Sequence, residues 1–111
     1  MKNGGMLNLV LADKKELLMS YMPFVANGGV FIPTDKKYEV GVEVFVVINI
    51  KEEKTKIPVP ARVVWLNYNN NTARKTGIGL QFAASDKGIS RNKIEKILAG
   101  ILNSDIKTYT I

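Results

Sequence analysis

Hydrophobic residues occur in short blocks between residues 6 and 82, separated by polar or glycine-containing segments. Five blocks are rich in β-branched and other apolar residues, which favours strands: residues 6–11, 30–33, 43–50, 57–67 and 76–82. Pro58 and Pro60 at the start of the fourth block suit an edge strand or a strand entry, because proline cannot donate a ladder hydrogen bond. The pattern predicts about five to six strands.

The segments between these blocks carry turn signals. Residues 27–29 read Asn-Gly-Gly, which tolerate positive φ, and residues 68–71 form a polar loop. Residues 13–16 are charged and are predicted to form a turn. Residues 17–24 are apolar but irregular, and Pro23 argues against a helix that runs through them.

The period of the pattern changes after residue 88. Apolar residues then recur every three or four positions, on one face of a helix: Ile94, Ile97, Leu98, Ile101 and Leu102. We expect Ser90 to be the N-cap and the helix to end near Asn103. Short strands followed by one amphipathic helix predict a mainly β fold, a small antiparallel barrel with a C-terminal helix that closes one end or packs on one face.

The length of 111 residues and the hydrophobic content of 46% fit a single domain. We expect its core to span about 7–102, with flexible ends at 1–5 and 104–111. The apolar run at 44–48 is too short to cross a bilayer, and residues 1–6 lack the apolar run of a signal peptide. We therefore expect a cytoplasmic protein.

The composition removes most catalytic chemistry. The chain has no cysteine and no histidine, so disulfides, thiolate metal sites and imidazole general bases are unavailable. The sequence also shows no phosphate-binding loop, nucleophile elbow or paired-carboxylate motif. We predict a protein that is not an enzyme and needs neither a metal nor a cofactor.

The net charge of +6 changes this picture little. Thirteen of the sixteen basic residues are lysines, and they are interleaved with ten acidic residues, as on a solvated surface. A nucleic-acid-binding barrel remains one hypothesis, since such domains combine a basic groove with stacking aromatic residues. The residues that motivate it are Trp65, Tyr68 and Arg74.

Three segments share an order and spacing with one known family. Residues 27–32 read Asn-Gly-Gly-Val-Phe-Ile, residues 61–65 read Ala-Arg-Val-Val-Trp, and residues 77–82 read Gly-Ile-Gly-Leu-Gln-Phe. A glycine turn before a strand, a Val-x-Trp strand and a Gly-x-Gly-x-x-Phe strand resemble the PilZ domain family. The resemblance extends over about 7–102 and implies a β-barrel that binds a ligand or a protein.

The chain departs from the family's receptors for cyclic di-GMP. These resemble one another in an Arg-x-x-x-Arg pair and in Asp/Asn-x-Ser-x-x-Gly, but here no arginine precedes Arg62. If Gly29 is the last glycine of the second motif, Ala26 stands at the serine position and Phe24 at the acidic one. Neither replaces the hydrogen bonds of that motif, so we expect no binding of cyclic di-GMP. The alternative is an atypical receptor that uses other cations: Lys14, Lys15 and Arg62.

The segments 21–25 (Tyr-Met-Pro-Phe-Val), 27–34 and 91–100 are similar to one branch of the family. Its short, single-domain members act in type IV pilus assembly and lack the same ligand-binding motifs. The resemblance implies an adaptor in pilus biogenesis and twitching motility. It also implies two partners, the pilus extension ATPase and, in some systems, a degenerate EAL-domain regulator, with recruitment to the inner-membrane pilus machinery.

Three surfaces are candidates for binding a partner, and the third, the C-terminal helix with its tail, has an Ile and Leu stripe that is expected to be core. Residues 17–24 form either a buried lid or an exposed anchor patch, and the latter is suggested because tyrosine and methionine are enriched at interfaces. The strand edge at 30–34 is the second, since another chain can add a strand there. The candidate contacts, led by Tyr21, are Tyr21, Met22, Pro23, Phe24, Val30 and Phe31.

Overall fold

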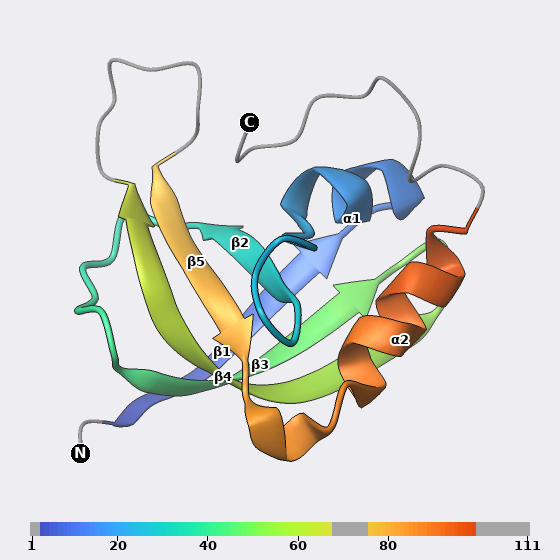
Figure 1. The fold of residues 1–111 in the computed structure, drawn as a ribbon. Coiled ribbons are helices and arrows are strands. Elements are labelled where there is room, and N and C mark those ends of the chain that lie inside the picture. Colours follow the sequence, from blue (N-terminus) through green and yellow to red (C-terminus); the bar gives the residue numbers. More distant parts are fainter. Residues whose placement is uncertain (1–2, 68–75, 100–111) are drawn as a thin grey trace.

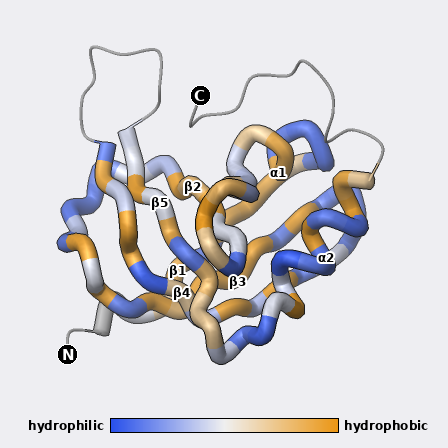
Figure 2. The backbone as a smooth tube through the Cα atoms, viewed as in Figure 1, coloured by the Kyte–Doolittle hydropathy of each residue, from blue (hydrophilic) through white to orange (hydrophobic). Residues whose placement is uncertain are grey.

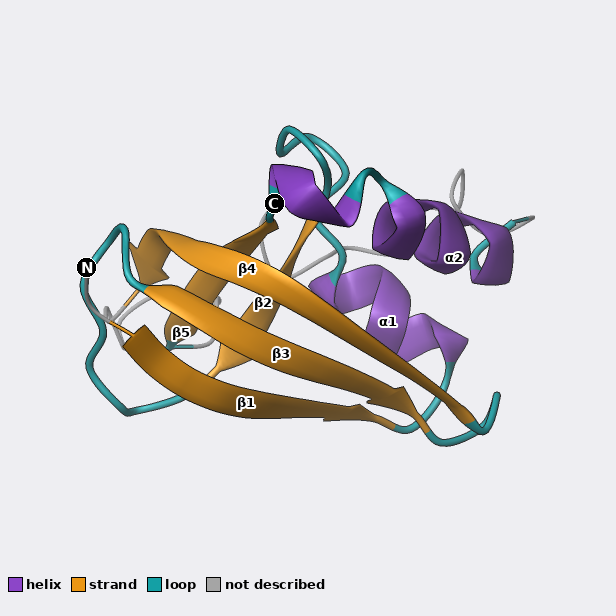
Figure 3. Cartoon of the chain, turned by 90° about the horizontal axis from the view of Figure 1, so that it is seen from below, coloured by secondary structure: helices purple, strands orange, loops and turns teal. Residues whose placement is uncertain are grey.

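Five strands form one curled sheet in the order β1-β3-β4-β5-β2, with two helices on the same side of it (Figures 1 and 3). The computed structural model describes residues 3–67 and 76–99. Along the chain the elements are β1 (Asn3–Leu11), α1 (Lys14–Ser20), β2 (Gly29–Pro33), β3 (Glu43–Ile50), β4 (Thr55–Asn67), β5 (Gly77–Phe82), the 3₁₀ turn η1 (Ala84–Asp86) and α2 (Ile89–Ile97). The predicted mainly β fold with a C-terminal helix is confirmed.

One pairing differs from the antiparallel barrel expected from the sequence. The β3–β4, β4–β5 and β5–β2 pairs are antiparallel, but β1 pairs with β3 in parallel. The chain returns from β1 through α1 and β2 before it enters β3, and such a long crossover is what a parallel pair requires. The alternation of apolar residues predicts a strand but not its direction, so the antiparallel prediction is wrong for β1.

Side chains that alternate along the strands build the core. On β3, Val44, Val46 and Ile48 are buried while Glu43 and Phe45 point to the other face. This two-residue period recurs on β4, and hydrophobic positions recur along every strand (Figure 2). The helices complete the core with fully buried side chains: Leu17 from α1 and Ile94 from α2.

The helix α1 contradicts the prediction of a charged turn at 13–16 and an irregular segment at 17–24. Asp13 is its N-cap, with the Oδ1 atom accepting a hydrogen bond from the Glu16 amide at 3.0 Å. The Glu16 carboxylate accepts in turn from the Ala12 amide at 2.9 Å. Asp-x-x-Glu is the spacing of a capping box, which the prediction overlooked. Pro23 does not interrupt the helix, because α1 has already ended at Ser20.

The start of α2 also differs from the prediction. Its N-cap is Gly88, whereas Ser90 lies inside the helix, so the prediction of Ser90 as N-cap is wrong. The Asp86 carboxylate accepts hydrogen bonds from the Ser90 amide at 2.8 Å and from its hydroxyl at 3.0 Å. The helix ends at Ile97, before the predicted end near Asn103, which lies outside the described residues.

The first strand begins earlier than the sequence predicts. It starts at Asn3 rather than at residue 6, and the expectation of flexibility at 1–5 stays a prediction. Gly5 adopts a φ of 78° where the register with β3 shifts, a conformation that favours glycine. The predicted loop at 68–71 and tail at 104–111 lie outside the described residues. Within residues 3–67 and 76–99, no helix is long and apolar enough to span a membrane.

We predict that Asp13→Ala lowers the free energy of unfolding by about 1 kcal/mol, because the Glu16 amide loses its acceptor at the start of α1. Urea denaturation measures the change. The exposed loop variant Asp35→Ala is the control and is expected to leave the stability unchanged. Equal losses in the two variants would contradict the capping role.

Candidate functional site

A small apolar cluster lies on the face of β2, β4 and β5 opposite to the main core. Val30 and Ile32 point into the core, so Phe31 between them points to the other face. There its ring packs on Trp65, with 5.5 Å between the ring centroids and 52° between the ring planes. Met22 reaches the same face, and both Met22 and Phe31 are buried.

The two outward glycines of β5 make room for this cluster. A Cβ atom at Gly79 would lie 3.1 Å from the Trp65 Cβ atom and 3.2 Å from the Met22 Cε atom. A Cβ atom at Gly77 would lie 2.7 Å from Phe31 Cζ. The Gly-x-Gly pattern of β5 therefore has a packing role in this chain.

Tyr21, the leading candidate for an exposed anchor, is only 1% exposed, which corrects that expectation. Its hydroxyl donates to the Glu95 Oε2 atom at 2.5 Å, and the Arg91 Nε atom donates to the same oxygen at 3.2 Å. Burial, and next the bond to Glu95, raise the pKa of Tyr21 above its usual 10.0, while the same bond lowers the pKa of Glu95. Tyr21 thus joins the end of α1 to α2.

The loop from α1 to β2 leaves a smaller apolar surface exposed than the sequence suggests. The Met22 amide donates to the Gly29 carbonyl at 2.8 Å, and the Gly28 amide donates to the Val25 carbonyl at 2.8 Å, so the loop is tightly turned. Pro23 is exposed, and Phe24 at its tip is 67% exposed. The exposed patch therefore consists of Pro23 and Phe24 rather than the whole segment.

The second predicted surface is the edge of the sheet at β2. This strand is the last in the sheet order, but Tyr21 forms an isolated antiparallel bridge to Val30 beside it. The side chains of Val30 and Phe31 are fully buried. A strand from another chain is thus hindered at the start of β2, and contact of these two residues with a partner stays a prediction.

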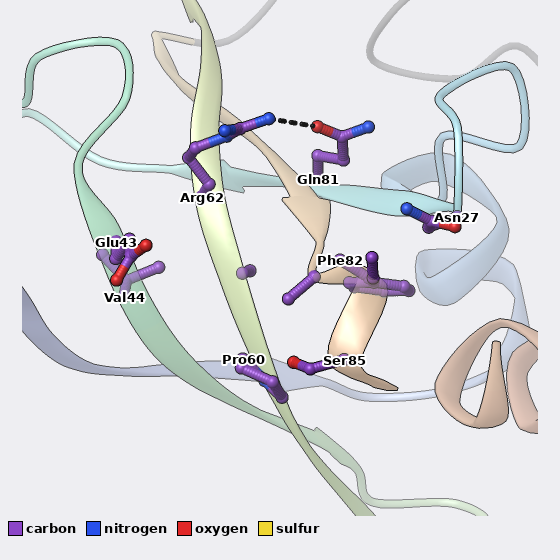
Figure 4. A pocket seen from close by; sticks show the side chains of 11 residues that line it. Asn27, Glu43, Val44, Pro60, Arg62, Gln81, Phe82 and Ser85 are labelled. Atoms are coloured by element: carbon purple, nitrogen blue, oxygen red, sulfur yellow. Dashed lines mark hydrogen bonds between the residues drawn. The ribbon is translucent and has the colours of Figure 1, made fainter. Parts of the chain in front are cut away.

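A pocket of about 370 Å³ lies beside the turn before β2 (Figure 4). Its wall includes Arg62 from β4 and Gln81 from β5. The Arg62 Nη2 atom donates to Gln81 Oε1 at 3.2 Å, and Gln81 Nε2 donates to the Ala26 carbonyl at 3.0 Å. These bonds connect β4 and β5 to the turn. Sequence reasoning missed Gln81, although it is the one long polar residue in β5.

The pocket is weakly suited to an anionic ligand. Arg62 and Glu43 both line it, so its two charged side chains have opposite sign. Lys14 and Lys15, the other cations of the atypical receptor, lie on α1 and do not line it. The Lys14 Nζ atom instead lies 4.0 Å from a carboxylate oxygen of Glu53. The structure does not bring the three cations together.

Nucleic-acid binding and metal binding find little support in the described residues. Trp65, proposed to stack on a nucleic-acid base, packs on Phe31, whereas Tyr68 and Arg74 lie outside the described residues. Among residues 3–67 and 76–99, no group of three or more acidic side chains is placed to hold a metal ion.

Comparison with known proteins assigns the family. The model of the PilZ domain matches residues 6–100, which extends from β1 to beyond the end of α2. A search of curated proteins finds no match. The match covers most of the chain and agrees with the curled sheet and the terminal helix. The chain therefore belongs to the PilZ domain family.

Proposed function

We propose that this PilZ domain is a non-catalytic adaptor of type IV pilus biogenesis and twitching motility that works by binding proteins. Its partners in this proposal are the pilus extension ATPase and, where the cell has one, a degenerate EAL-domain regulator. The protein would act in the cytoplasm and be recruited to the inner-membrane pilus machinery. PilZ domains are generally binding modules without catalysis, which agrees with the absence of cysteine and histidine.

The observation that carries the proposal is the position of Phe24. If Gly29 is the last glycine of the receptors' Asp/Asn-x-Ser-x-x-Gly motif, their acidic or amide side chain is replaced here by a phenylalanine, 67% exposed, at the tip of the loop. An aromatic ring held in water on a tightly turned loop is the kind of group that protein interfaces bury. The same loop has Ala26 at the serine position. In this alignment the loop has no side chain at these two positions that could hydrogen-bond a nucleotide, and it presents an apolar one.

The charges of the pocket support the absence of cyclic di-GMP binding. Two phosphates need several positive donors, and in this pocket Arg62 is accompanied by Glu43. The guanidinium group is also engaged with Gln81. A dinucleotide would have to break that hydrogen bond, and its phosphates would be repelled by the nearby carboxylate of Glu43.

An atypical cyclic di-GMP receptor is the second candidate, favoured by one observation. Arg62 and Asn27 both line the pocket beside the Asn-Gly-Gly turn before β2. Calorimetric titration with cyclic di-GMP tests it, with Arg62→Ala as the comparison. Heat that saturates in the unmodified chain and disappears in Arg62→Ala would establish the receptor. No heat at about 1 mM, a concentration that detects even weak binding, would exclude it.

We predict that Phe24→Ala weakens capture of the pilus extension ATPase by about thirtyfold, the effect of losing an interface residue worth about 2 kcal/mol. The thermal midpoint should not change, because the ring is mostly in water. Capture from the cell's own lysate, quantified by mass spectrometry, measures the loss. The control is Val40→Ala, another exposed apolar side chain, 62% exposed, in the loop before β3.

Two results would count against this account. If Phe24→Ala and Val40→Ala retain the ATPase equally, the partner surface lies elsewhere. If the unmodified chain captures no pilus component, the adaptor role itself is wrong.

A further inference from the structure

The edge of the sheet at β1 is long and lacks the charged residues and proline that often protect an edge strand. Proteins commonly protect an edge strand with charged residues or proline, which oppose pairing with another chain. The nine residues of β1 include neither, and the one irregularity of its register lies between Asn3 and Met6, before the regular segment 6–11. The opposite edge, β2, has five residues, ends in Pro33 and is bridged by Tyr21. Figure 3 shows β1 as the outer margin of the sheet, with β3 beside it.

Among the described residues, no strand pairs with the outer side of the β1 backbone. The Leu11 carbonyl accepts a hydrogen bond from the amide of Lys51, the residue after β3. The backbone N–H and C=O groups of Leu11, and of every second residue before it, therefore point toward β3. The N–H and C=O groups of Met6, Asn8 and Val10 therefore point away from β3. Within the part of the chain that the structure describes, β1 pairs with β3 alone.

The side chains of the same three residues lie on the outer face of the sheet. Met6 is 66% exposed and Val10 is 51% exposed, whereas Leu9 and Leu11 point into the core. Phe45 on β3 is the register partner of Met6 and extends the exposed apolar surface. This edge therefore offers both backbone groups and apolar side chains to a partner strand.

The order of residues in β1 specifies what fits there. Around Asn8 the strand reads Met-Leu-Asn-Leu-Val, an apolar pattern that is the same in both directions. In antiparallel pairing of two such strands about Asn8, Met6 faces Val10 of the second copy and the two Asn8 side chains face each other. Shifting the centre to Leu7 or Leu9 places Asn8 opposite an apolar residue instead. No like charges meet, although the chain carries +6.

We propose that two copies of the chain pair through β1, antiparallel about a two-fold axis at Asn8, so that one sheet continues across both. A single strand pair buries less area than the standard interface, so we expect a dissociation constant of about 0.1 mM. Each dimer then presents two copies of every other surface of the domain. The proposal does not depend on which protein the adaptor binds.

Disulfide formation from single introduced cysteines tests the register, because the chain has no cysteine of its own. Facing residues in a hydrogen-bonded antiparallel pair have Cα atoms about 5.5 Å apart, a distance that a disulfide spans. We expect Asn8→Cys to form a dimeric disulfide about tenfold faster than Val40→Cys, since pairing raises the effective concentration of the thiol. A mixture of Met6→Cys and Val10→Cys should give the mixed disulfide in excess over either homodimer.

Sedimentation equilibrium of the full chain, from about 10 μM to about 1 mM, tests the association itself around the expected constant. Asn8→Lys should abolish the dimer by placing two lysines opposite each other, and Val40→Lys should retain it. Both substituted side chains are exposed, so the fold is kept. A chain that stays monomeric at about 1 mM, or equal disulfide rates for Asn8→Cys and Val40→Cys, would overturn the proposal. In that case, the edge would be left to a strand of another protein.

Discussion

Replacing Gly77 with alanine is expected to lower the free energy of unfolding by about 3 kcal/mol, the upper range for an overpacked site. A Cβ atom there would collide with the Ile32 carbonyl oxygen and lie 2.9 Å from Pro33 Cα, both on the neighbouring strand β2. It would also lie 2.7 Å from Phe31 Cζ. Backbone atoms of a paired strand cannot move away without breaking the ladder. Urea denaturation measures the loss.

Gly79→Ala provides the matched comparison within the same strand. Its Cβ atom would lie 3.2 Å from the flexible end of Met22 and 3.1 Å from the Trp65 Cβ atom, so that neighbours need to shift by only a few tenths of an ångström. We expect a loss of about 1 kcal/mol or less, since fewer unfolded conformations partly offset the crowding. Equal losses in the free energy of unfolding for Gly79→Ala and Gly77→Ala would contradict the claim that backbone contacts make Gly77 the more sensitive position.

Replacing Tyr21 with alanine is expected to lower the free energy of unfolding by about 3–5 kcal/mol, as for other buried aromatic residues. The ring is among the largest fully buried side chains, and its hydroxyl bonds Glu95 on α2. Tyr21→Phe keeps the ring and loses only that bond, so we expect about 1–2 kcal/mol. Urea denaturation of both variants separates the two contributions. Similar small losses in both would contradict the buried position.

This prediction limits how Tyr21 can be used to map a partner. Loss of binding in Tyr21→Ala would report a destabilised domain rather than a missing contact. Phe24→Ala is the suitable variant, because its side chain is mostly in water. Tyr21→Phe serves as a second control, since it changes the link between α1 and α2 without opening the core.

The pH dependence of stability should show the same link. Because the pKa of Tyr21 is raised, the folded chain keeps its phenol proton where the unfolded chain releases it, and stability falls as pH rises above 10.0. The pKa of Glu95 is lowered, so its contribution is present above the unfolded pKa and is lost as pH falls through the folded one. Tyr21→Phe should reduce both slopes. Identical slopes above pH 10.0 in the two proteins would contradict this link.

The strands could be predicted from the sequence because burial on one face imposes a two-residue period. The block at 43–50 coincides with β3 for that reason. The helix α1 could not be predicted from periodicity, because its seven residues span barely two turns and show too few repeats of the helical pattern. The parallel pairing of β1 could not be predicted, since the same alternation serves either direction.

The residues of the candidate site could not be predicted from the sequence for a different reason. An apolar aromatic segment has the same composition whether it lies in a core or at an interface, so residues 17–24 left both alternatives open. The hydroxyl of the buried Tyr21 finds its hydrogen-bond partner in Glu95, which is 74 residues further along the chain. Phe24, three residues later, is exposed because the loop turns back at Met22 and Gly28. The pocket likewise combines Asn27, Arg62 and Gln81 from separate segments.

The most direct test of the adaptor role is a calorimetric titration of the purified chain with the pilus extension ATPase of the same cell. It is run with and without cyclic di-GMP, and the nucleotide is also titrated alone. We predict saturable binding of the ATPase, the same affinity in the presence of the nucleotide, and no heat from the nucleotide alone. Saturable heat from cyclic di-GMP together with no heat from the ATPase would contradict the account and identify the chain as a second-messenger receptor.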